Sequence, residues 1–232
     1  LQVTAQNPGI IFPVFSNGLL VDDKTLLALK KQPQVIPVIS IEGLGSHTDT
    51  RRGHGVHEAV EQRLRFFQKE KIFFGVSITV TTENYVTVTS EKFTRDLIDM
   101  GCQLFFYVEY VPVKPGTESL ILNDDQRWYL QQLPTRFSRQ FPALFIGFPG
   151  DEEQYGGCLA AGRGFIHVSP GGNLEPCPFA PFSDVNVGNR PLKEALQSKF
   201  LETVRRNHHK LTEDKGGCAL WANRDWVESI RN

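Results

Sequence analysis

The four cysteines of this 232-residue chain are unevenly distributed, and three of them fall in its last third. Cys158 and Cys177 flank the segment "LAAGRGFIHVSPGGNLEP", and Cys218 follows a pair of glycines. Sharp glycine or proline turns beside a thiolate can direct backbone amides at the sulfur, as an iron–sulfur cluster requires. Cys158, Cys177 and Cys218 are therefore candidate ligands of such a cluster.

Other roles for these cysteines stay open at this point. They can be buried free thiols, or two of them can form a disulfide, although a reducing compartment disfavours disulfides. They can also bind a structural zinc ion, which needs a fourth nitrogen or sulfur ligand. His167, or the pair His208 and His209, is available for that position. The remaining cysteine, Cys102, opens an apolar run and is expected in the core.

The composition limits the class of protein. The chain is 40% hydrophobic and has a formal net charge of −1, so it can bury a large core and has no strong field for nucleic acid or a membrane surface. Its longest apolar runs are far shorter than the roughly 20 residues of a membrane helix. The start, "LQVTAQNPG", lacks the regions of a secretory signal and reads as the end of a helix. We therefore expect a cytoplasmic protein, and the initial Leu favours part of a longer one.

Residues 1–150 contain the elements that must position a site. Apolar, β-branched or aromatic runs alternate there with polar turns and amphipathic stretches. The five runs cover residues 10–15, 35–40, 72–82, 103–113 and 143–150. This alternation predicts parallel strands joined by right-handed helical crossovers. The expected fold is α/β, with helices packed on a parallel sheet.

Polar residues stand at the ends of four of these runs, where parallel sheets build their sites. They are Ser16, Asn17, Ser40, Glu42, residues 79–84 and Glu109. Turn chemistry alone also places such residues after strands, so a purely structural role stays possible.

The alternation stops after residue 150. Residues 151–232 contain a predicted hairpin, with a strand near residues 163–168, a turn at "SPGGN", and one long helix in "PLKEALQSKFLETVRRN". The acidic loop "GDEEQYGG" is expected to be an exposed charged segment. So small and loop-rich a segment predicts a separate α+β domain that depends on a bound metal or cluster.

The tail resembles the shortened SPASM, or twitch, domain of radical S-adenosylmethionine enzymes. That domain has a cysteine, a spacer, a glycine, four residues and a second cysteine. Here Cys158 is followed by 13 residues, Gly172, "NLEP" and Cys177, and Cys218 stands where a later ligand is expected. The resemblance implies that Cys158, Cys177 and Cys218 bind an auxiliary [4Fe–4S] cluster. Its fourth iron can be open for substrate, water or a non-cysteine ligand, or an upstream cysteine can complete the ligand set.

The first part of the chain resembles the barrel of the same enzymes from its third strand onward, which implies a partial (β/α) barrel of the TIM-barrel kind. "FPVFSNGLLVD" resembles the third strand, "VISIEGLGSHTDTRRGHG" the fourth with its loop, "GVSITVTTEN" the fifth and "FFYVEYVPV" the sixth. The resemblance implies that Ser40 and Arg52 hold the methionine part of S-adenosylmethionine, since a guanidinium recognises a carboxylate through paired hydrogen bonds. It places Thr79 beside the ribose, and Ser16 and Asn17 at the cofactor side of the first strand. Ser16 and Asn17 can instead form a simple turn, and Arg52 can be a solvated loop charge.

The chain departs from the family because it contains no Cys-x-x-x-Cys-x-x-Cys loop. We expect the C-terminal portion of an oxidoreductase that generates a 5′-deoxyadenosyl radical and abstracts hydrogen from a peptide or small-molecule substrate. The complete enzyme would use S-adenosylmethionine, a second [4Fe–4S] cluster and an electron donor such as flavodoxin or ferredoxin, and this portion alone would be inactive. The alternatives are a degenerate relative and a non-enzymatic binding module stapled by zinc.

Overall fold

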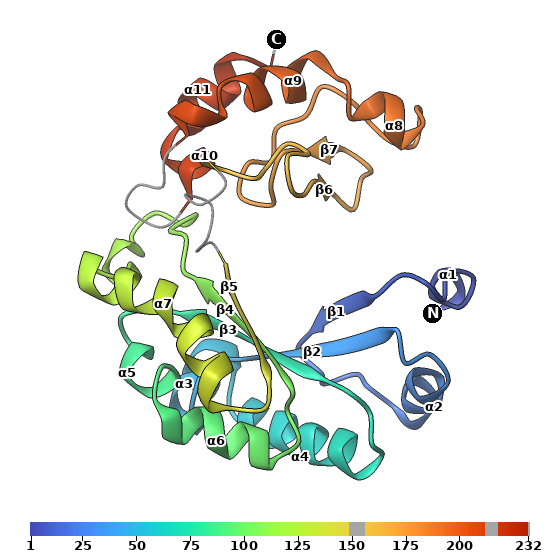
Figure 1. Ribbon diagram of the computed structural model, residues 1–232, viewed down its shortest axis with the longest axis vertical. Coiled ribbons are helices and arrows are strands. Elements are labelled where there is room, and N and C mark those ends of the chain that lie inside the picture. Colours follow the sequence, from blue (N-terminus) through green and yellow to red (C-terminus); the bar gives the residue numbers. More distant parts are fainter. Residues whose placement is uncertain (149–155, 212–217, 232) are drawn as a thin grey trace. The chain divides into compact units, whose positions relative to one another are not determined.

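The computed structural model describes residues 1–148, 156–211 and 218–231, which form two compact units (Figure 1). The first unit comprises Leu1–Glu109 and Leu122–Phe148, and the second comprises Tyr110–Ile121 and Pro149–Asn232. The predicted domain boundary at residues 150 and 151 lies outside the described residues, as does most of the acidic loop. No helix in the described part of the chain is long and apolar enough to cross a membrane.

One parallel sheet forms the centre of the first unit. Its strands are β1 (Phe12–Ser16), β2 (Val35–Ile41), β3 (Gly75–Val80), β4 (Leu104–Glu109) and β5 (Leu144–Phe148). All neighbours pair in parallel, and the strands lie side by side in sequence order. The predicted α/β fold is confirmed, and every strand coincides with a predicted apolar run.

The sheet is strongly curved. The rings of Phe15 in β1 and Phe106 in β4 contact each other, with their centroids 5.0 Å apart. These strands are three strand spacings apart, which is about 14 Å in a flat sheet. The sheet must therefore curl toward the face that carries these two rings, as expected of a partial barrel. We call this concave surface the open face.

Helices connect the strands and cover the opposite face (Figure 1). They are α2 (Asp23–Lys31), α3 (Gly45–Arg52), α4 (Val56–Lys69), α5 (Tyr85–Val88), α6 (Glu91–Asp99) and α7 (Asp124–Gln140). The short helix α1 (Gln2–Ala5) precedes β1 and has no buried residue. Side chains cap the starts of α2, α6 and α7: the Asp22 side chain accepts from the Thr25 N–H of α2 at 2.8 Å, Ser90 accepts from the Phe93 N–H of α6 at 3.3 Å, and Asn123 forms a capping box with Gln126 in α7. The apolar sides of α4, α6 and α7 form the core with the helix-facing side of the sheet.

The helix α3 lies where the sequence predicts a loop. Its residues lack an apolar stripe, so periodicity does not reveal it. Asp49 of α3 accepts hydrogen bonds from the backbone N–H groups of His57 at 2.8 Å and Gly55 at 3.0 Å, at the start of α4. These bonds hold the pKa of Asp49 below its usual range. The turn thus formed between α3 and α4 brings two arginines of α3 to the end of β2.

The second unit contains short elements. They are the 3₁₀ turns at Glu118–Leu120 and His208–Lys210, the strands β6 (His167–Val168) and β7 (Leu174–Glu175), and the helices α8 (Leu192–Ala195), α9 (Lys199–Arg206), α10 (Ala219–Ala222) and α11 (Arg224–Ser229). The antiparallel pairing of β6 and β7 confirms the hairpin, but its first strand is shorter than predicted because residues 159–165 fold back as a loop. The predicted long helix is split, since Ser198 caps α9 by accepting from the Leu201 N–H at 3.2 Å.

Candidate functional site

The open face carries polar side chains near the carboxyl ends of β2 and β3. Ser40 of β2 pairs in register with Ser77 of β3, and Thr79 follows on the same face two residues later. All three residues are half-buried. The structure therefore brings the predicted residues Ser40 and Thr79 onto one face of neighbouring strands.

The side chains of Ser16 and Asn17 accept hydrogen bonds from the backbone of the turn after β1. The Ser16 Oγ accepts from the Gly18 N–H at 3.1 Å, and the Asn17 Oδ1 accepts from the Leu19 N–H at 3.2 Å. Ser16 pairs in register with Ile39, which is buried in the helix-covered core. Ser16 thus belongs to the face opposite Ser40, and the structure does not bring these two residues together.

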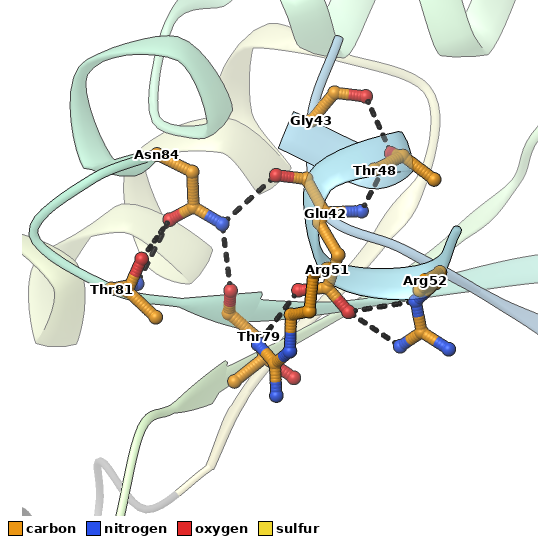
Figure 2. A network of polar contacts seen from close by, with 8 residues as sticks. All are labelled: Glu42, Gly43, Thr48, Arg51, Arg52, Thr79, Thr81 and Asn84. Atoms are coloured by element: carbon orange, nitrogen blue, oxygen red, sulfur yellow. Dashed lines mark hydrogen bonds and ion pairs between the residues drawn. The ribbon is translucent and has the colours of Figure 1, made fainter. Parts of the chain in front are cut away.

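A buried carboxylate holds two arginines at the end of β2 (Figure 2). Glu42 is only 1% exposed, and it receives a hydrogen bond from Arg51 Nη1 on Oε2 at 2.9 Å and one from Arg52 Nε on Oε1 at 2.9 Å. The Nη2 of Arg52 also contacts Oε1. Two guanidinium groups on one carboxylate leave an excess of positive charge, which suits the recognition of an anion. Arg52 is therefore an ordered part of this cluster, and not a solvated loop charge.

Asn84 joins the ends of β2 and β3 (Figure 2). Its Nδ2 donates to the carbonyl oxygens of Glu42 at 2.9 Å and Thr79 at 2.8 Å, and its Oδ1 accepts from the Thr81 N–H at 2.8 Å. The Glu42 N–H in turn donates to the Oγ1 of Thr48 in α3 at 3.2 Å. Asn84 was among the predicted strand-end residues, but its partner Glu42 lies 42 positions away in the sequence, and no local pattern marks that contact. This network ties the Glu42 backbone to the strand that carries Thr79.

Replacing Asn84 with alanine should lower the free energy of unfolding by about 2–3 kcal/mol, because three backbone groups at the strand ends, two of them in buried hydrogen bonds, lose their partner. Asn17→Ala is the matched control, since Asn17 is exposed and bonds only its own turn; its effect should stay below about 0.5 kcal/mol. Urea unfolding followed by circular dichroism measures both. Equal losses in the two variants would show that Asn84 does not hold the strand ends together.

A second buried carboxylate ends β4. Glu109 is 3% exposed and accepts a hydrogen bond from the Nε of Arg127, in α7, at 2.8 Å. Burial raises the pKa of Glu109, and the neighbouring guanidinium opposes that rise. Two of the predicted polar strand ends are therefore carboxylates that arginines hold in the core.

The three tail cysteines lie in one apolar core. Cys158, Cys177 and Cys218 are 7%, 4% and 9% exposed and belong to the same buried cluster. A hydrogen bond with Cys218, together with burial, raises the pKa of the Cys177 thiol. The Cys218 Sγ also accepts from the Trp221 N–H at 3.4 Å. Cys177 and Cys218, 41 positions apart in the sequence, are thus direct neighbours.

Three cysteine thiols form a donor set that an iron–sulfur cluster or a zinc ion can use. Within residues 1–148, 156–211 and 218–231, no three His, Cys, Asp or Glu side chains form a group spaced for one metal ion. A [4Fe–4S] cluster does not need such convergence, because each cysteine binds a different iron. The proposed fourth zinc ligands have other contacts: His167 Nδ1 bonds Glu175 at 2.8 Å, and His208 Nδ1 lies 2.7 Å from the Arg205 carbonyl oxygen.

Cys102 is separate from this group. It lies in the first unit, is 1% exposed, and its thiol donates to the Leu104 carbonyl oxygen at 3.4 Å. Burial raises the pKa of this thiol to about 12. Its predicted place in the core is confirmed.

No protein-family model and no curated protein sequence matches the chain. Solved structures match its fold. SuiB from Streptococcus suis has a TM-score of 0.63 and 16% identity over 84% of this chain. The protein anSMEcpe with bound AdoMet has a TM-score of 0.65 and 15% identity over 93% of this chain. The chain spans only 50% of the SuiB chain and 68% of the anSMEcpe chain.

Both proteins have been solved with S-adenosylmethionine (AdoMet), and both also with a peptide. SuiB was solved with S-adenosylmethionine and with its precursor peptide SuiA. The anSMEcpe protein was solved with AdoMet and a Cp18Cys peptide. At this level of identity the similarity shows a shared fold, and function must be argued from the site.

Proposed function

We propose that the chain is the C-terminal portion of a radical S-adenosylmethionine enzyme whose tail, residues 151–232, binds an auxiliary [4Fe–4S] cluster. The observation that carries the proposal is the curved parallel sheet, whose open face presents Ser40 and Thr79 beside the cluster formed by Glu42, Arg51 and Arg52. The sequence resemblance and the fold shared with two proteins solved with AdoMet support it.

The side chains of Ser40, Glu42 and Arg52 fit the methionine part of S-adenosylmethionine. Arg52 offers a guanidinium for its carboxylate, and Glu42 holds that guanidinium in one orientation, which lowers the entropy lost on binding. Ser40 offers a hydroxyl on the open face, and Thr79 lies one strand further, on the side assigned to the ribose. When bound with an N-terminal [4Fe–4S] cluster, S-adenosylmethionine supplies the radical chemistry for hydrogen abstraction.

Cys158, Cys177 and Cys218 would hold the auxiliary cluster. The thiol of Cys177 is protonated when no metal is bound, since the hydrogen bond with Cys218 and burial both raise its pKa. Cluster assembly must therefore displace protons, and the affinity for iron should increase with pH. The apolar core around the three sulfurs excludes water from the site.

We propose a peptide as the substrate and a small electron-transfer protein, such as flavodoxin or ferredoxin, as the electron donor. The peptide proposal is supported by the peptides bound to SuiB and anSMEcpe. A peptide can lie along a barrel mouth while its reacting carbon faces the cofactor.

Anaerobic reconstitution with iron and sulfide tests the proposal. The chain should take up about four irons, bind equimolar sulfide and become brown. A chain that instead binds one zinc ion and no iron would overturn the radical-enzyme proposal for the tail and favour the zinc-stapled binding module. A chain that binds neither metal would favour the degenerate relative.

A further inference from the structure

Ala161 has a backbone conformation that residues with a side chain rarely adopt. Its φ is 57°, in the left-handed region, and the residue is fully buried. Such a conformation persists only where the surroundings hold it, and it often marks a functional position. Ala161 lies three positions after Cys158, so the contacts that hold it bear on the placement of this cysteine.

Two hydrogen bonds hold the backbone of Ala161, one at its N–H and one at its carbonyl oxygen. Its N–H donates to the carbonyl oxygen of Pro176 at 3.0 Å, and its own carbonyl oxygen accepts from the Nη1 of Arg205, in α9, at 2.8 Å. Pro176 directly precedes Cys177. Ala161 is therefore the point at which the segments of Cys158 and Cys177 meet, and α9 secures that point.

The remaining backbone of residues 157–165, which we call the Cys158 loop, folds on itself. The Gly162 N–H donates to the Phe165 carbonyl oxygen at 2.7 Å, and the Gly164 N–H donates to the Leu159 carbonyl oxygen at 2.8 Å. Arg163 Nη1 donates to the Gly157 carbonyl oxygen at 3.0 Å. These bonds make the loop compact, so a contact at Ala161 orients the loop as one piece.

We propose that Arg205 is a positioning residue that fixes the Cys158 loop against the Cys177 segment through Ala161. The guanidinium of Arg205 contacts the loop from α9, and it can be removed without changing either cysteine segment. A charge-assisted hydrogen bond to a buried carbonyl is stronger than a neutral one, and its loss leaves that carbonyl without this partner. The consequence for iron ligation rests on the proposed function, whereas the orientation of the loop does not.

Hydrogen exchange on the full chain without iron tests whether Arg205 holds the Cys158 loop in its orientation. In Arg205→Gln, the amides of residues 159–165 should exchange about 10-fold faster or more, and Arg205→Lys should lie between this variant and the unchanged chain. Arg206→Gln is the matched control on the same helix, because Arg206 pairs only with exposed Glu202 at 2.5 Å. It should leave these amides unchanged.

The loss of iron from the reconstituted chain to a chelator tests the consequence for iron ligation. The visible absorbance of Arg205→Gln should decay about 10-fold faster than that of Arg206→Gln. Equal exchange and equal decay in the two variants would overturn the proposal. If the unchanged chain takes up no iron, the proposed function fails, and the exchange experiment still decides whether Arg205 holds the loop.

Discussion

Replacing Cys177 with alanine should reduce iron uptake from about four atoms per chain to less than one. Cys177 is the most buried of the three tail cysteines and contacts Cys218 directly. Its loss removes one thiolate and opens the core that shields the other two. Cys158→Ala and Cys218→Ala should have the same effect, because a cluster with two remaining cysteine ligands dissociates.

Cys102→Ala is the matched control for this series. Cys102 is as deeply buried as the tail cysteines but lies in the first unit. The variant should keep about four irons per chain, measured by colorimetric iron analysis and visible absorbance after anaerobic reconstitution. Loss of iron from Cys102→Ala to the same extent as from Cys177→Ala would show that the iron is bound non-specifically, and the assignment of the three cysteines would be wrong.

Replacing Glu42 with glutamine should lower the free energy of unfolding by about 3 kcal/mol. Removing one partner of a buried ion pair leaves the opposite charge uncompensated, and here two guanidinium groups lose the same carboxylate. The partial exposure of Arg51 and Arg52, whose side chains are 42% and 25% exposed, keeps the loss below the upper end of the range for buried pairs.

Glu61→Gln is the control for Glu42, since Glu61 and Arg65 form an exposed pair within α4 at 2.6 Å. This variant should lose less than about 0.5 kcal/mol in the same urea titration. The double variant Glu42→Gln with Arg52→Gln should recover part of the loss, because it removes a guanidinium whose carboxylate partner is gone. A loss for Glu42→Gln no larger than that for Glu61→Gln would argue against Glu42 as the anchor of the arginines.

The sequence by itself determined the order and type of the main elements. Five apolar runs became five parallel strands, and caps such as Asp22 marked where helices begin. These features depend on neighbours within a few residues, so they can be read from local spacing. The resemblance of the spacing around Cys158, Gly172 and Cys177 to that of the twitch domain marks these cysteines as candidate ligands.

Only the tertiary structure decided which of those residues lie together. The strand register put Ser16 and Ser40 on opposite faces, although both end apolar runs. The pairing of Asn84 with Glu42 spans 42 positions, and a local pattern carries no information on such contacts.

Long-range contacts also determine which segments meet in the second unit. The segment Tyr110–Ile121 directly follows β4, yet it belongs to the second unit, where Val111 packs in the core that contains the three cysteines. The contact of Cys177 with Cys218, and the bond from Arg205 to Ala161, also join segments that are far apart in the chain. Local residue types determine which helices and strands form. Long-range packing determines which side chains meet, and a functional site depends on that packing.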